Sequence, residues 1–136
     1  MPKQQNQLFV NLELCETPVS IGSEVAETDI IDLQVTKVSA CPYAVVGGNI
    51  CYTATIVNNS DVDFITGEFG ALEISDPLAS NVEYVEGSFE YTIGSGEPVQ
   101  VEPNIDVSNV MTYDIEIPAG ETAVVTFCVK VLCLPE

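Results

Sequence analysis

Three side chains that could react with one another, Lys37, Asn58 and Asp76, each end an alternating apolar segment. Successive side chains of a strand point to opposite faces, and each of the three shares the parity of the larger apolar residues in its segment. They are therefore predicted to point inward near strand ends. A buried lysine is costly unless it is paired, and its desolvated amine is nucleophilic. The trio could form a Lys–Asn isopeptide bond with the acid protonating the amide; alternatively, Lys37 sits at the rim while Asn58 and Asp76 cap turns.

Cysteine is the second reactive residue type, with five copies in the chain. A zinc site is disfavoured because no Cys-x-x-Cys pair occurs, whereas the spacing suits disulfides and the odd count leaves one sulfur for an intermolecular bond. By parity Cys51 and Cys128 face away from the core. Cys15 and Cys133 lie near the chain ends, where they could join neighbouring subunits. The alternatives are intrachain pairing and unpaired thiols acting as small hydrophobic groups. The disulfide candidates are Cys15, Cys41, Cys51, Cys128 and Cys133.

Residues 1–29 form an arm or linker whose composition differs from the rest of the chain. Residues 7–14 partly alternate, as an extended strand would, and the stretch from Pro18 to Asp29 is predicted to be a linker. Such a segment could complete the open sheet edge of a neighbour, which is a head-to-tail contact. The alternatives are a disordered tail and a strand packed on its own domain. The expected donor residues are Leu8, Val10, Leu12 and Leu14.

Charge restricts the partners. The chain has 21 acidic residues against three lysines, for a formal net charge of -18. Binding to nucleic acid or to an anionic membrane is not expected, because both need basic groups. No stretch is long and apolar enough for membrane insertion. Acidic loops such as the one holding Asp61 and Asp63 could bind Ca²⁺, but the EF-hand spacing is missing and a solvated face is the simpler interpretation.

The missing residue types also bear on catalysis. The chain has no histidine, no arginine and no tryptophan. It therefore lacks the usual general base, the bidentate clamp for carboxylates and phosphates, and the best stacking platform. We expect no enzymatic activity, no metal and no cofactor.

Residues 30–136 are predicted to form one domain of about seven strands. Short alternating segments are separated by turn residues every 8 to 12 positions, which is typical of a β-sandwich. No segment shows a helical period. The expected strands are 32–38, 49–58, 71–76, one or two within 82–93 broken near Gly87, 110–117 and 122–132.

Four ordered segments resemble the conserved-repeat domain of bacterial and archaeal surface proteins, known as domain of unknown function 11. They are Gly48–Ser60, with its Tyr-Thr pair and closing Asn-Asn-Ser, and then Ile74–Leu78, Val82–Ser88 and Ile117–Phe127. Lys37 also stands where that family has a lysine in its first strand. The resemblance covers about residues 30–132 and implies an immunoglobulin-like β-sandwich with a surface-structural role. The single copy, the arm and the cysteines depart from the family pattern.

These features together predict a structural subunit of a self-assembling fibre or appendage. The partner is expected to be the protein itself, joined by strand donation and intersubunit disulfides. The expected location is extracellular, on a bacterial cell or spore surface, although no secretory signal is visible at the start of the sequence. The alternative is a monomeric adhesin-like module that binds a carbohydrate or a metal ion.

Overall fold

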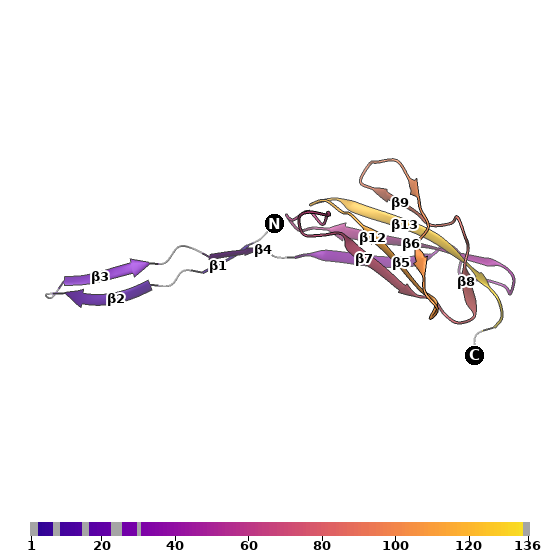
Figure 1. Cartoon of the computed structure of the whole chain (residues 1–136), viewed down its shortest axis with the longest axis horizontal. Helices are drawn as coiled ribbons and strands as arrows, with labels where there is room; N and C mark the ends of the chain where they lie inside the picture. Colours follow the sequence, from indigo (N-terminus) through magenta and orange to yellow (C-terminus); the bar gives the residue numbers. More distant parts are fainter. Residues whose placement is uncertain (1–2, 7–8, 15–16, 23–25, 30, 135–136) are drawn as a thin grey trace.

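The computed structural model describes residues 3–6, 9–14, 17–22, 26–29 and 31–134, with side chains described from residue 31 onward. Every regular element within these residues is a strand. Four strands form an N-terminal arm, and nine form two antiparallel sheets arranged as a sandwich (Figure 1). The all-β sandwich class predicted from the sequence is confirmed.

The larger sheet has the strand order β10-β9-β13-β6-β5, and β8 pairs with β13 beyond the end of β9. Two long strands at its centre, β6 and β13, are antiparallel over nearly their full length. Its strands are β5 (Leu33–Ser39), β6 (Asn49–Asn58), β8 (Val82–Tyr84), β9 (Glu90–Ile93), β10 (Val99–Gln100) and β13 (Thr122–Val131).

The smaller sheet has the order β11-β12-β7 and packs on the inner face of the larger one. It has three strands, so it covers less width than the sheet opposite. Its strands are β7 (Leu72–Pro77), β11 (Asn104–Ile105) and β12 (Val110–Ile115).

Strand β13 shows how the sequence produces the core. Its apolar residues alternate with polar or smaller ones, and the inward set is almost completely buried. Side chains two positions apart share one face of a strand, so one alternating segment supplies a continuous apolar stripe. The inward residues of β13 are Ala123, Val125, Phe127, Val129 and Val131.

The observed strands agree closely with those predicted from residue 32 onward. Strand β6 has the expected bounds, and the expected break within 82–93 separates β8 from β9. That break lies at Gly87, whose φ of 81° is a left-handed conformation that favours glycine. The two-residue strands β10 and β11 were not predicted, because such short segments show no alternation.

The arm differs from the prediction. Strand β2 (Phe9–Leu14) pairs with β3 (Thr17–Gly22), and β1 (Lys3–Asn6) pairs with β4 (Ala26–Asp29), both antiparallel. The expected linker from Pro18 to Asp29 was therefore wrong, because much of it forms the return strands of a long hairpin. Figure 1 shows this hairpin leading away from the sandwich.

Candidate assembly interface

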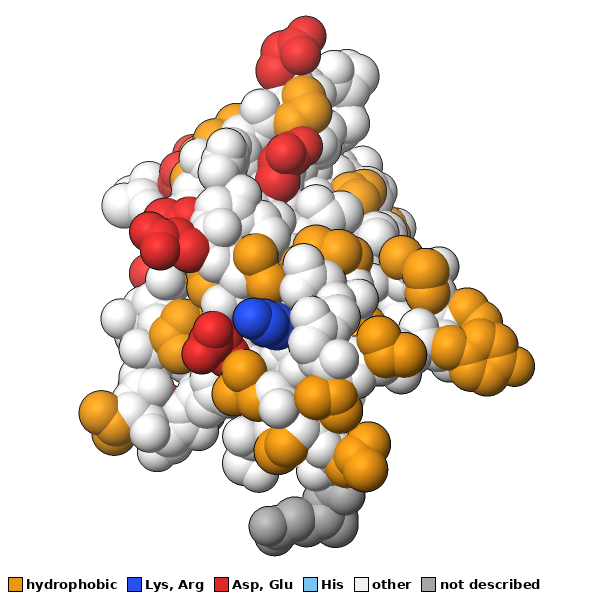
Figure 2. Space-filling view, turned by 90° about the vertical axis from the view of Figure 1, so that its right-hand side faces the viewer, with side chains coloured by type: hydrophobic (Ala, Val, Ile, Leu, Met, Phe, Trp, Pro, Cys, Tyr) orange, Lys and Arg blue, Asp and Glu red, His pale blue; other side chains and the backbone are white. Residues whose placement is uncertain are grey.

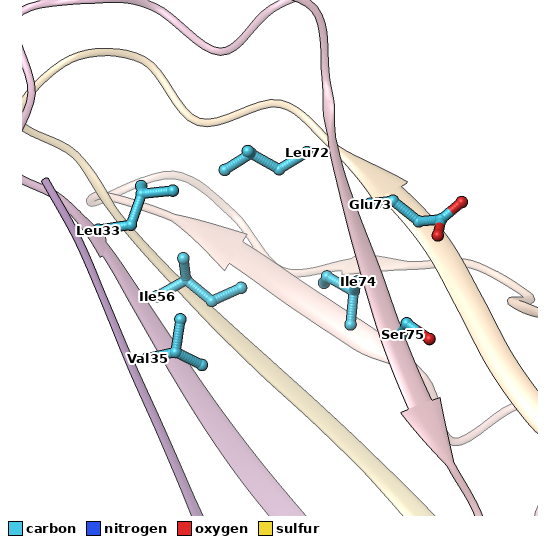
Figure 3. A pocket seen from close by; sticks show the side chains of 7 residues that line it. All are labelled: Leu33, Val35, Ile56, Leu72, Glu73, Ile74 and Ser75. Atoms are coloured by element: carbon cyan, nitrogen blue, oxygen red, sulfur yellow. The ribbon is translucent and has the colours of Figure 1, made fainter. Parts of the chain in front are cut away.

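An apolar groove lies between strand β5 of the larger sheet and strand β7 of the smaller sheet. It has a volume of about 280 Å³. Figure 3 shows the side chains of Glu73 and Ser75 pointing away from it, while the apolar side chains point into the space between the strands. These inward residues are Leu33, Val35, Ile56, Leu72 and Ile74.

Both strands beside the groove are sheet edges. In the described part of the chain, strand β5 pairs only with β6, and β7 pairs only with β12. Each therefore presents one row of backbone N–H and C=O groups that has no strand partner among the described residues. Val35 shares the parity of Leu33 and lines the groove, yet it is 68% exposed. The predicted inward face of β5 is confirmed, but the sandwich is open along this side.

Lys37 and Asp76 join the two edges. The Lys37 Nζ donates to Oδ2 of Asp76 at 2.5 Å, and it lies 4.4 Å from the centre of the Tyr52 ring and 5.5 Å from that of Phe127. Both charged residues line a smaller hollow of about 160 Å³, together with residues of β7 and the segment after it. The structure therefore joins Lys37 and Asp76 in an ion pair at the rim of the sandwich, where the Lys37 side chain is 40% exposed.

Asn58 is placed elsewhere. Its backbone pairs with Leu33, four positions along β5 from Lys37, which corresponds to a separation of about 13 Å at strand spacing. Its side chain is fully buried, and Nδ2 donates to the carbonyl oxygens of Val62, Ile117 and Pro118. The predicted isopeptide trio is therefore not assembled. Asn58 instead organises the turn after β6, which corresponds to the capping alternative.

Cys51 and Cys128 form a disulfide across the central pair of strands. They stand directly opposite each other on β6 and β13, with their Cα atoms 4.0 Å apart. The Cys51 carbonyl accepts a hydrogen bond from the N–H of Ala40, and the Cys128 carbonyl accepts one from the N–H of Val85. Both carbonyls therefore point away from the opposite cysteine, and the two residues form a non-hydrogen-bonded pair of the antiparallel ladder. The expectation that both side chains leave the core face is confirmed, and the intrachain alternative holds for these two cysteines.

Cys41 and Cys133 carry free, exposed thiols. Cys41 follows β5 and Cys133 follows β13, and both strands end at the side of the sandwich away from the arm (Figure 1). The side chain of Asn81 holds the tail in place by donating to the Cys133 carbonyl. Cys15, the remaining candidate, lies outside the described residues, as does Leu8 of the expected donor segment.

The same end of the sandwich exposes apolar side chains. Figure 2 views this end, and hydrophobic side chains cover much of its lower and right-hand parts, whereas acidic ones lie mostly in the upper part. The loop after β5 is tied to the C-terminal strand, because Gly47 N–H donates to the carbonyl of Val131. The exposed apolar residues of this loop and tail are Tyr43, Val45, Val46, Leu132 and Leu134.

The described strands of the arm make no contact with the strands of the sandwich. Strands β1 to β4 pair only among themselves, and no contact joins any of them to β5 through β13. A cis-packed arm, one of the alternatives considered from the sequence, is not what this structure shows.

The acidic loop that was a candidate for Ca²⁺ is tied into the fold. Asp63 Oδ1 accepts from the N–H of Ala119, which joins this loop to the turn before β13. Among residues 31–134 and the described arm segments, no group of three His, Cys, Asp or Glu side chains is placed to hold a metal ion. In the same part of the chain, no helix has the length and apolar character needed to cross a membrane.

The groove itself was not predicted from the sequence. Its residues were correctly assigned to inward faces, but alternation gives no information about whether an inward face is covered.

No protein-family model, curated protein or solved structure matches this chain.

Proposed function

We propose that this protein is a structural subunit of a self-assembling extracellular fibre or appendage on a bacterial cell or spore surface. Subunits are joined head to tail by the N-terminal arm and by intersubunit disulfides. The observation that carries the proposal is the position of the arm, which leads away from a sandwich that its strands do not touch. A hairpin that extends away from its own sandwich can reach another molecule, and a second copy is the simplest partner.

The polarity of the molecule supports an open chain of subunits. The arm leaves one end, and the exposed thiols of Cys41 and Cys133 lie at the other end beside an apolar surface. Contacts between unlike ends of identical molecules are heterologous, so they generate rings or filaments. The resemblance to surface-repeat domains in four ordered segments points to the same structural role.

Covalent joining follows from the free thiols. Two thiols of neighbouring subunits form a disulfide when they lose two protons and two electrons to an oxidant such as molecular oxygen or a small disulfide. Such bonds hold together subunits whose net charge of -18 opposes association. No catalytic turnover is part of this function.

The test is the intact mass of the natively assembled protein after full denaturation, with and without reductant. A ladder of covalent multimers that collapses to the monomer on reduction is expected. The variant C133S should shorten the ladder, whereas the double variant C51A/C128A should leave it intact because those sulfurs bond within one chain. A monomer mass in both conditions, from a preparation that also stays monomeric before denaturation, would overturn the fibre proposal in favour of a monomeric adhesin-like module.

A further inference from the structure

The geometry points to the β5–β7 groove as the acceptor site for strand Phe9–Leu14 of a second copy of this chain. The incoming strand pairs with the free edge of β7 and places its apolar side chains over Leu33 and Val35. This inference rests on the proposed function and specifies which surface of the sandwich receives the arm.

The groove is the place in the sandwich that can accept a strand. Of the four strands that end the two sheets, β10 and β11 are two residues long, whereas β5 has seven residues and β7 has six. Only a long edge provides enough backbone groups to template another strand. On the β10–β11 side, the chain also passes from one sheet to the other through residues 101–103, which connect these two short strands.

The three-stranded sheet is too narrow to cover the inner face of the larger sheet, and the uncovered part lies over β5. Strand β7 does not extend over β5, so Val35 remains 68% exposed although it lies on the inward face. A fourth strand beside β7 would cover that face. Its outward residues would stand next to Glu73 and Ser75, which point away from the groove (Figure 3), so a strand with one apolar and one polar face fits.

The arm strand has the required pattern. Val10, Leu12 and Leu14 share one parity, while Phe9, Asn11 and Glu13 share the other, which is polar except at its first residue. Strand β2 has six residues, and β7 offers the four residues Leu72–Ser75 for pairing on the arm side of the Lys37–Asp76 ion pair. Strand β2 uses one edge for β3, so its other edge is available to β7 without opening the hairpin.

A second copy, and not the same chain, supplies the strand. Strand β4 ends at Asp29 and β5 begins at Leu33, so the hairpin joins the sandwich through a connection of three residues. Figure 1 shows the hairpin continuing away from the sandwich beyond this junction. Insertion into its own groove would require the chain to reverse direction there and lie back along β5.

The Lys37–Asp76 ion pair marks the closed end of the acceptor site. It is the one side-chain bond between β5 and β7 among the described residues, and it lies on the far side of Val35 and Ile74 from the arm. The ion pair itself lines the separate, smaller hollow that also includes Leu78, and neither of its residues lines the groove. The strand is therefore received between the ion pair and the end of the sandwich from which the arm leaves.

The experiment compares Val35 with Val38 in the full chain. The two residues lie on the same strand and are 68% and 62% exposed, but they face opposite sides. The variant V35D should weaken self-association under reducing conditions by at least about tenfold in the midpoint concentration, because a carboxylate would be buried against the arm. The variant V38D should change it by less than about twofold. Sedimentation velocity gives the midpoint, and circular dichroism checks that both variants fold.

A photo-crosslinking amino acid at position 35 or 38 then identifies the occupant. Chains of natural isotope content are mixed with ¹⁵N-labelled chains before assembly, and the crosslinked peptides are read by mass spectrometry. Crosslinks from position 35 to residues 9–14, with mixed isotopes, are expected, and position 38 should give few. Assembly in which V35D behaves like V38D, or in which position 35 reaches a different segment, overturns the acceptor site and leaves the fibre intact. Crosslinks within one chain assign the arm to its own groove and overturn the intersubunit contact. A wild-type chain that stays monomeric overturns both proposals.

Discussion

The two sides of the sandwich are closed in different ways. On the side of β10 and β11 the chain passes directly from one sheet to the other, and Phe89 beneath it is completely buried. On the side of β5 and β7 the Lys37–Asp76 ion pair joins the two edges, and Val35 remains exposed. Both sides have inward apolar residues of the same kind. The open side therefore differs from the closed side in lacking a covering strand, and not in lacking inward apolar residues.

The largest expected effect comes from removing a side chain on the closed side. Phe89 packs against the rings of Tyr113 and Phe127, at centroid distances of 5.3 and 6.2 Å. The variant F89A should lower the free energy of unfolding by about 3–5 kcal/mol because it leaves a cavity in the core. The matched variant V35A should cost less than about 0.5 kcal/mol in the monomer. Urea unfolding of dilute protein in reductant, followed by tyrosine fluorescence, measures both. A similar cost for the two variants would mean that the groove is filled in solution.

The next effect concerns the disulfide on the outer face of the larger sheet. Cys51 and Cys128 are 77 positions apart, so the bond removes much freedom from the unfolded chain. The double variant C51A/C128A should lower the free energy of unfolding by about 2–4 kcal/mol without reductant. In reductant that breaks the bond, the wild type and the variant should agree. A wild type that loses no stability on reduction would contradict the expected constraint on the unfolded chain.

The ion pair across the groove should contribute less. The Lys37 and Asp76 side chains are 40% and 17% exposed, so solvent screens their attraction. The variants K37M and D76N, measured singly and together, should give a coupling energy of up to about 1 kcal/mol, and this should fall in high salt. A coupling near zero would mean that packing alone holds the two edges in their positions. The methionine removes the charge that lies over the Tyr52 ring and keeps an unbranched side chain of similar length.

The smallest effect is a dependence on alkaline pH. Burial, followed by the hydrogen bond with Tyr91, raises the pKa of Tyr113 above its ordinary value of 10.0. The unfolded chain therefore loses this proton first, so the stability is fully present below pH 10 and decreases as the pH rises through the folded-state pKa. The variant Y113F should show a weaker decrease between pH 9 and 11 by urea unfolding. An equal decrease in the variant would assign the effect to other groups, of which Tyr84 is the first to test because burial raises its pKa as well.

Much of the sandwich could be predicted because its signals are local. Alternation in β6 and β13, the left-handed glycine at position 87 and the proline after Asp76 define strands and breaks within a few residues. The side of its strand on which Lys37 or Cys128 lies could also be predicted, because side chains alternate between the two faces of a strand. The arm hairpin was missed because Pro18 and Gly22 suggested a linker, although each pairs within a strand.

The sequence by itself determined most strands of the sandwich, the direction in which each of their side chains points and the excess of acidic residues over lysines. Tertiary structure alone decided which strands are neighbours. That decision placed Cys51 opposite Cys128, brought Lys37 to Asp76, and separated Asn58 from both. It also left the groove beside β7 uncovered. The reason is that alternation is set by the local geometry of one strand, whereas register and coverage depend on contacts between segments far apart in the chain.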